Sequence, residues 1–444
     1  MSQRTGKQKK RGDSDDNDGL STAGKVALGV AAAAAGAAIG YFGSRLLSAW
    51  LSEPEQEKQM KCDGSKSAES KPHSKDDVAS DDSTRHTPRC HVNSINHAAA
   101  QQLSLHEHLF HYYNEYVDIP SDKMQSVQKV VDQVILAVKS QLREPNSFKG
   151  LALKIGDLVP FGSATEGLQV VRPNYFDVMV PIMFGSPCHA QEAFVGGRKV
   201  PGSFVIVVPD DDTSKSDDRK VCDENEQLVT RKLLHVVQEV IEKATEVVSG
   251  YQCIVQPPQH NSMDVSVAVC AGGYDITVNF LPFIIIDSHL FLPEAGPTQL
   301  SAQSDIHSRL WTESFVRQEK WSIDRFDSSV CGHLIVLKIL KAIRLNHLEQ
   351  FGAISSYHLK LLLFHVLEDV PDSCDWHRNA VGERLIDLLT KLTEVLREHH
   401  LPHYFEQNVN TLEHVPLEMS NNLAKFIGKK LVHNDIASLL KRDY

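Results

Sequence analysis

The most regular hydrophobic pattern in the chain lies between residues 127 and 142, where valine, isoleucine and leucine recur at the spacing of one helix face. Pro120-Ser121 precedes this pattern and is a typical helix start. A second helical pattern runs over residues 226–248. Apolar runs of strand length predict strands at 158–161, 176–184, 204–208, 253–256, 265–270 and 276–286.

After residue 325 the strand-like runs stop and only helical patterns follow. They predict helices at 331–346, 357–368, 381–399 and 419–440. The sequence therefore predicts an α/β (α+β) lobe over residues 103–325, followed by an all-helical lobe over residues 326–444. A cleft between two such lobes is a common place for a ligand.

The first hundred residues show three different compositions. Residues 1–25 form a charged tail, with a basic cluster followed by an acidic one. No residue from Val26 to Ser44 is charged, and as a helix this stretch would be about 28 Å long, close to the hydrocarbon thickness of a bilayer. Residues 26–50 are therefore predicted to be a single transmembrane anchor. Residues 51–102 are rich in Ser, Lys, Asp and Glu, which predicts a disordered linker.

Residues 26–50 have three alternative interpretations besides a retained anchor. They are a cleaved signal peptide, a mitochondrial presequence and an unanchored Ala-rich helix. The acidic cluster before the apolar stretch argues against the first two. Gly36 and Gly40 form a G-x-x-x-G motif that lets two such helices approach closely, so a homodimer is one expectation.

Composition and charge narrow the partners and the compartment. The formal net charge of the 444-residue chain is −11, and no basic stripe follows residue 60, so nucleic acid is not an expected partner. The eight cysteines show no C-x-x-C or Cys/His ligand spacing, and several sit in apolar runs. Reduced thiols in a cytosolic domain are the expected reading, with disulfides as the alternative.

The stretch from Leu158 to Pro181 carries the strongest chemical signal. An apolar run ends at Gly162-Ser163, a short polar segment follows, and the next apolar strand carries Asp177. A nucleotidyltransferase needs this order, because the glycine and the serine can approach a phosphate and carboxylates on the next strand can hold a metal. Two carboxylates on one strand face must be two residues apart, and here these positions are Tyr175 and Asp177.

The amino-acid sequence of this stretch resembles the male-abnormal-twenty-one (Mab) family of nucleotidyltransferase-like proteins. This family includes cyclic GMP-AMP synthase and the mitochondrial dynamics (MiD) proteins. The resemblance covers roughly residues 103–444. It rests on GS-x-x-EG with PNYFDVMVP, FLP at Phe280, Leu310-Trp311, LKILKAI at Leu337 and SSYHLK at Ser355.

The resemblance implies three metal-binding carboxylate positions, which fall on Tyr175, Asp177 and Asn279. Only Asp177 is a carboxylate here. A phenol and an amide are poor substitutes for anionic ligands of Mg²⁺, so a metal site and catalysis are not expected. The region at 343–355, where a DNA-sensing synthase would carry a zinc loop, contains no cysteine.

Nucleotide binding can persist without catalysis. The predicted binding residues are Gly162, Ser163, Tyr175, Asp177, Lys338, Ser356 and Tyr357. The resemblance places the last three on the helical wall of the cleft and implies ADP or GDP as the ligand, with no cofactor required. The alternatives stay open: the lysines can be the solvated edge of a helix, and Tyr357 can belong to the core.

Taken together, the resemblance implies a catalytically inactive receptor or adaptor of the mitochondrial outer membrane. The soluble part would face the cytosol and recruit a dynamin-related fission GTPase. The alternatives are an active cyclic GMP-AMP synthase-like enzyme and an inositol trisphosphate receptor-interacting-type protein, the latter at the endoplasmic reticulum membrane. In MiD-type proteins the GTPase docks on a basic loop, whereas the corresponding loop here, residues 210–226, is net acidic, so its role stays open.

Overall fold

The computed structural model describes residues 104–440, except for 145–146, 149–150, 152, 186, 210–217, 258–262 and 295–307. The segments expected to form the tail, the anchor and the linker therefore lie outside the described residues. Among the residues that are described, no helix is long and apolar enough to span a bilayer.

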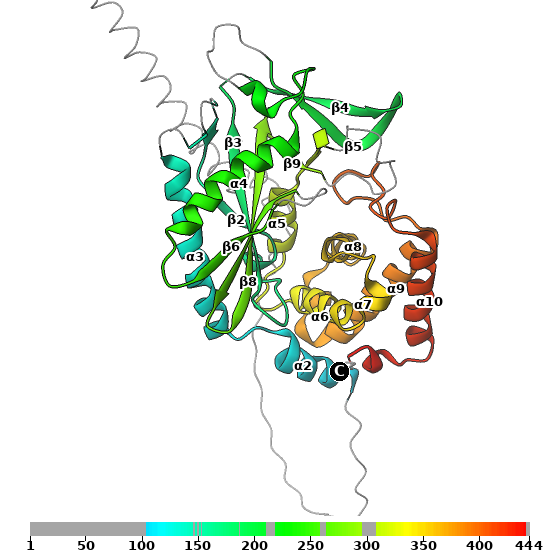
Figure 1. Cartoon of the computed structure of the whole chain (residues 1–444). Coiled ribbons are helices and arrows are strands. Elements are labelled where there is room, and N and C mark those ends of the chain that lie inside the picture. The colour runs from blue at the N-terminus through cyan, green and yellow to red at the C-terminus, as the bar shows by residue number, and fades with distance from the viewer. Residues whose placement is uncertain are drawn as a thin grey trace, which may run out of the picture. The chain divides into compact units, whose positions relative to one another are not determined.

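The mixed lobe contains a sheet of ten strands within the described part of the chain, together with helices α3 and α4 (Figure 1). The strands are β1 Lys154–Ile155, β2 Val159–Phe161, β3 Tyr175–Met183, β4 His189–Val195, β5 Arg198–Val207, β6 Gln252–Val255, β7 Val265–Ala271, β8 Tyr274–Ile286, β9 His289–Pro293 and β10 Leu310–Glu313. The helices are α3 Ser121–Arg143 and α4 Thr230–Glu246, with short helical turns η3 Gly162–Ala164 and η4 Asp218–Val221.

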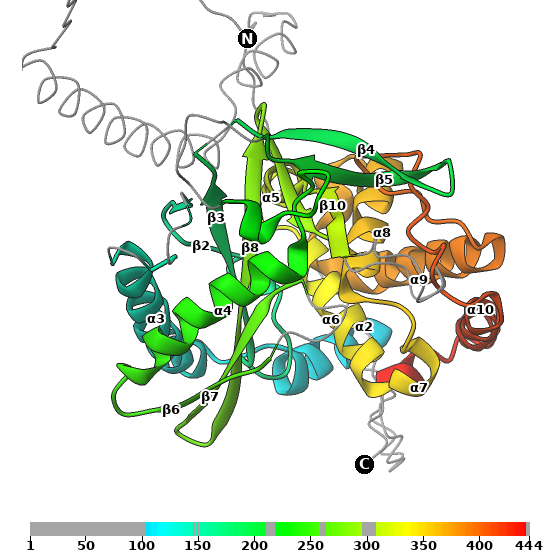
Figure 2. The same cartoon turned by 45° about the horizontal axis from the view of Figure 1, so that its top comes forward.

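The main path of the sheet runs β1-β3-β8-β9-β10-β5-β4, and β2, β6 and β7 join beside it. Strands β3 and β8 are parallel neighbours, while the other pairs are antiparallel. Helices α3 and α4 lie side by side and pack on the sheet (Figure 2). Their valine and leucine faces join the inward residues of β3, β7 and β8 in one core, as the helical spacing predicted.

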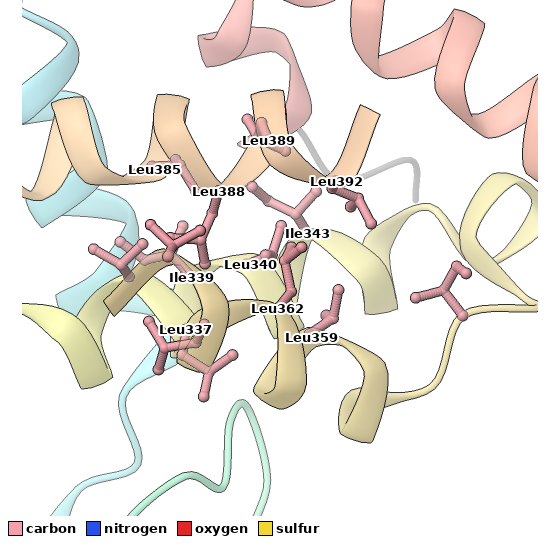
Figure 3. Packing of buried hydrophobic residues seen from close by; sticks show 14 of the residues in the cluster. Leu337, Ile339, Leu340, Ile343, Leu359, Leu362, Leu385, Leu388, Leu389 and Leu392 are labelled. Carbon is pink, nitrogen blue, oxygen red and sulfur yellow. The ribbon is translucent and has the colours of Figure 1, made fainter. Parts of the chain in front are cut away.

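The remaining helices form the second lobe. They are α5 Val316–Asp324, α6 His333–Asn346, α7 Leu348–Phe351, α8 Ser356–Asp369, α9 Val381–Glu398 and α10 Leu417–Val432, with short turns η6 Ser373–Trp376, η7 Arg378–Ala380 and η8 Ile436–Leu440. Figure 3 shows the leucine and isoleucine side chains of α6, α8 and α9 that meet in its core. Helix α6 is apolar on nearly all sides, which suits an element surrounded by other helices.

The first described helix, α2 Leu105–Tyr112, also packs in this helical core, and the turn η2 Tyr113–Val117 follows it. Its contacts are with α9 and η8, near the other end of the chain (Figure 1). Ser104 and Glu107 form a capping box that starts the helix. Residues 105–117 thus belong by packing to the helical lobe, although their position in the sequence suggested the mixed lobe.

The predicted long helices and six strands are confirmed, although β5 begins six residues before its predicted start, and among residues 326–440 no strand forms. One helix is shorter than predicted: α10 ends at Val432, because Asn434 adopts a left-handed conformation with φ of 51° that closes the helix. Strands β1, β4, β9 and β10 and helices α2, α5 and α7 were not predicted. Most of them are short, and β4 is an edge strand with a bulge, so none carries a regular apolar period.

Candidate functional site

The turn η3 joins β2 to the segment that leads into β3. Phe161, the last residue of β2, pairs with Asp177 of β3, so the turn sits directly over this carboxylate. Gly162 has φ of 74°, and a Cβ atom there would lie 3.0 Å from the Asp177 Oδ2 atom. Glycine is therefore required at this position for both its conformation and its small size.

Asp177 and Asn279 lie opposite each other on the parallel strands β3 and β8. The Asn279 side-chain amide donates a hydrogen bond of 2.9 Å to Asp177 Oδ1, and Ser266 of β7 donates one of 2.9 Å to Asn279 Oδ1. Burial raises the pKa of the Asp177 carboxyl, and the bond from Asn279 partly offsets this. The Asn279 side chain therefore presents an N–H donor to Asp177, where a metal site would need an oxygen atom with a free lone pair.

Tyr175 is placed differently from its sequence prediction. It begins β3 two residues before Asp177, but its side chain is 57% exposed and does not line the cavity described below. Its carbonyl oxygen accepts a hydrogen bond from the Gln169 side chain. The prediction that Tyr175 lies in the ligand cleft is thus corrected, because this first residue of β3 is exposed and does not line the cavity.

Two lysines of α6, one turn apart, differ in their partners and in whether they line the cavity. Lys338 pairs with Asp118 and lies over the ring of Tyr113, outside the cavity lining. Lys341 is buried and donates to Ser163 Oγ at 3.0 Å and to the Leu168 carbonyl at 2.6 Å. The prediction that Lys338 reaches the cleft is corrected, since Lys341 takes that place.

Burial has the largest effect on the pKa of Lys341. Removal from water lowers the pKa of its ammonium group from the ordinary 10.5 to about 8, and the nearby Glu166 carboxylate only partly counteracts this. The group is therefore charged at neutral pH, in a place where only a hydroxyl and a carbonyl oxygen accept its hydrogen bonds. A buried ammonium without an ion pair is suited to an anionic ligand.

A buried ion triad joins the two lobes beside Lys341. Lys360 of α8 lies 2.8 and 2.9 Å from the two oxygens of Glu166 and 2.8 Å from Glu319 Oε2. All three side chains are at most 10% exposed. Burial alone would lower the pKa of Lys360, but Glu319 and Glu166 raise it above its ordinary value. Glu166, which follows the Gly162-Ser163 turn, thus bridges to the helical lobe.

Tyr357 extends this network to the loop after α9. Its hydroxyl donates to Glu319 Oε1 at 2.8 Å and lies 2.9 Å from the Nε2 atom of His403. Burial, followed by the Glu319 charge, raises the pKa of Tyr357, and burial lowers the pKa of His403. Both groups are therefore neutral at physiological pH, and the tyrosine serves as a hydrogen-bond donor.

An open cavity of about 460 Å³ lies among these elements. Its lining includes five of the seven predicted binding residues, namely Gly162, Ser163, Asp177, Ser356 and Tyr357. Met263, Leu292, Pro293, Phe315 and Val316 contribute apolar surface on other parts of the wall. The cavity thus has an apolar region and a polar end at the turn, as sites for small polar ligands do.

Sequence reasoning missed four of the charged or aromatic residues at the site: Glu319, Lys341, Lys360 and His403. A usable signal existed for the two lysines, because LKILKAI and HLKLLLF place them in helices that are apolar on nearly all sides. Nothing comparable marked Glu319 or His403. Their roles depend on packing between segments far apart in the chain.

The structure also shows the surroundings of His358, the cysteines, the potential metal ligands and the end of the acidic loop. His358 is packed, with its Nε2 atom 3.0 Å from the Thr411 carbonyl oxygen. The six cysteines of the described part are free thiols. No cluster of three or more potential metal ligands occurs among the described residues. In the acidic loop, Asp223 pairs with Arg309 at 2.8 Å, so the end of the loop is anchored rather than solvated.

Comparison with known proteins gives two domain matches. The Mab-21 protein nucleotidyltransferase domain matches residues 164–321, and the Mab-21 protein HhH/H2TH-like domain matches residues 333–429. The first range runs from the end of η3 through β10 into α5, and the second runs from α6 into α10. The fold and the turn beside Asp177 thus define a nucleotidyltransferase-fold protein with a helical C-terminal domain. The chain belongs to the Mab-21 family.

Two relatives illustrate the family. The chain is 25% identical over 333 residues to mitochondrial dynamics protein MID51 of Danio rerio, with 71% of this chain and 66% of the relative covered. It is 23% identical over 344 residues to protein mab-21-like of Aedes aegypti, with 72% of this chain and 90% of the relative covered. The resemblance read from the sequence motifs is thereby confirmed at the level of the family.

Proposed function

We propose that this protein is a non-catalytic nucleotidyltransferase-fold adaptor. The observation that carries the first part of the proposal is the pairing of Asp177 with Asn279. At the positions where the resemblance implies metal carboxylates, Asp177 accepts a hydrogen bond from an amide and Tyr175 faces solvent. A single carboxylate with an N–H group beside it is a poor ligand set for Mg²⁺.

The test of inactivity is a turnover assay with the purified chain, nucleoside triphosphates and Mg²⁺ or Mn²⁺. We expect no nucleotide product. The double variant Tyr175→Glu with Asn279→Asp supplies the two absent carboxylates and shows whether the assay can detect recovered activity. Turnover by the unmodified protein that disappears in Asp177→Ala would overturn the non-catalytic assignment.

The adaptor role is supported by the similarity to a mitochondrial dynamics protein and by the predicted anchor over residues 26–50. In this proposal the chain is held in the mitochondrial outer membrane, its folded lobes face the cytosol, and it recruits a dynamin-related fission GTPase. The anchor would fix the position of the receptor, while the linker would let the lobes turn freely.

Two experiments test this role. A fluorescent fusion of residues 1–50 should label the mitochondrial surface, and the chain without these residues should be dispersed in the cytosol. Labelling of the endoplasmic reticulum would contradict the membrane assignment. Purified fission GTPase should co-sediment with the chain attached to liposomes, and co-sedimentation that is equal with bare liposomes would contradict recruitment.

The cavity supports a further part of the proposal, the binding of a nucleotide such as ADP or GDP. The turn amides and Lys341 would hold phosphate, and the apolar wall near Phe315 would hold the base. A ligand at 100 times its dissociation constant would stabilise the folded state by about 2.7 kcal/mol. Ser163→Ala and Lys341→Met should reduce the resulting melting shift, whereas Lys338→Met should not.

A further inference from the structure

The charges around the cavity are unusual for a nucleotide site. Of the described residues that line it, four are carboxylates and two carry ammonium groups: Glu166, Asp177, Glu313 and Glu319 against Lys341 and Lys360. The polar end therefore has more negative than positive groups. A polyphosphate entering this space meets repulsion unless cations compensate for it.

Lys360 is not available to provide this compensation. Both carboxylates of the triad hold it at 2.8–2.9 Å, and its side chain is 10% exposed. Moving Lys360 to a phosphate would leave Glu166 and Glu319 buried without their shared counter-ion, which is strongly unfavourable. The positive charge of Lys360 is therefore already used within the protein.

Lys341 is differently placed. Its two hydrogen bonds go to a hydroxyl and a backbone carbonyl, and within the described residues it forms no ion pair. An ammonium group has three donors, so one remains for a ligand. Together with the N–H groups of the Gly162 turn, Lys341 can bind one phosphate group well. A second or third phosphate finds no further uncompensated lysine in the described lining.

We propose that the triad Glu166–Lys360–Glu319 makes the cavity select nucleotides of low phosphate charge, so that affinity without divalent cations falls from monophosphate to diphosphate to triphosphate. This inference rests on the proposed nucleotide site and makes its ligand class more specific. Glu166 and Glu319 act as specificity-determining residues because they neutralise the second lysine of the wall. A diphosphate binds, but less tightly than the corresponding monophosphate.

The test is calorimetric titration of the full chain with AMP, ADP, ATP, GMP, GDP and GTP at constant ionic strength in the presence of EDTA. For the unmodified protein we expect the affinity to fall about three-fold or more with each added phosphate. Glu166→Gln keeps the shape of the side chain but removes one negative charge. It should raise the affinity for triphosphates about ten-fold, and that for monophosphates less.

Two further variants make the result specific. Glu319→Gln should also raise the affinity for triphosphates. It replaces Glu166→Gln as the test if a melting curve shows that Glu166→Gln folds poorly. Asp118→Asn is the matched control, because it frees Lys338, a lysine on the same helix that does not line the cavity. In this control the order of affinities should be unchanged.

The possible failures can be told apart. If triphosphates bind the unmodified protein as tightly as monophosphates, or if neither glutamine variant changes the order, the triad does not set specificity, although the cavity remains a nucleotide site. If none of the six nucleotides binds the unmodified protein or either variant, the proposed nucleotide site is itself wrong. The inference about the triad then falls with it.

Discussion

Replacing Lys360 by methionine tests how strongly the ion triad stabilises the junction of the lobes. The change removes the shared partner of Glu166 and Glu319, whose side chains are 8% and 9% exposed. Tyr357 continues to donate to Glu319, but both carboxylates lose their ammonium donor. Removing one partner of a buried pair costs about 3–5 kcal/mol, and we expect a loss in this range at pH 7.

Differential scanning calorimetry of the purified chain measures the effect. For a large domain each kcal/mol shifts the melting temperature by roughly 2–4 °C, so the variant should melt about 6–20 °C below the unmodified protein. Lys199→Met is the control, because Lys199 pairs with Glu192 at the surface, where both side chains are 52% exposed. Loss of such a pair costs about 1 kcal/mol or less.

A compensating variant checks the cause. Combining Lys360→Met with Glu166→Gln and Glu319→Gln removes the unpaired charges, so most of the lost melting temperature should return. If Lys360→Met melts within the range of the Lys199 control, the triad is not a stabilising ion network. If the triple variant melts no higher than Lys360→Met alone, the lost packing of Lys360 is responsible rather than the stranded carboxylates.

Three other predictions concern single groups. In the folded protein the pKa of Lys341 is about 8, below its ordinary 10.5. Between these two pH values the unfolded chain therefore binds more protons than the folded one. The free energy of unfolding should rise with pH across this range by about 3 kcal/mol. Urea titrations at pH 8 and 10 should show this rise, and Lys341→Met should abolish it. Burial raises the pKa of Glu294 from 4.5 to about 7, so the free energy of unfolding should fall by about 3 kcal/mol as pH rises through this window. Urea titrations at pH 4.5 and 7 should show this fall, and Glu294→Gln should remove it. Gly162→Ala should destabilise the protein by about 1–2 kcal/mol, because the residue has a positive φ and the new methyl group meets Asp177; an unchanged melting temperature would contradict this.

Much of the fold could be predicted from local patterns. Helices α3, α4 and α9 have enough turns for their apolar period to be unmistakable, and the switch from strands to helices near residue 325 separates the two lobes. Several shorter elements were not predicted, since strands of two to five residues such as β1 and β9 carry little pattern. Helix α2 was missed although Ser104 and Glu107 offered a capping-box signal.

For the site, the sequence determined the turn at Gly162-Ser163, the carboxylate at Asp177 and the amide at Asn279, because each follows from residue type and strand position. The tertiary structure decided which lysine enters the cavity. Lys338 and Lys341 are neighbours on one side of α6, and the choice between them depends on Asp118 and the segment around Leu168.

The partners in the ion triad could be predicted from the sequence even less well than the lysine that enters the cavity. Lys360 stands in an apolar helix, and its position there indicates burial but does not identify a partner. Its carboxylates are 194 and 41 residues away in the chain, and no local pattern encodes such a pairing. Local sequence specifies elements because their periods reflect backbone geometry, whereas a charge network between lobes depends on how distant segments pack, which only the folded chain determines.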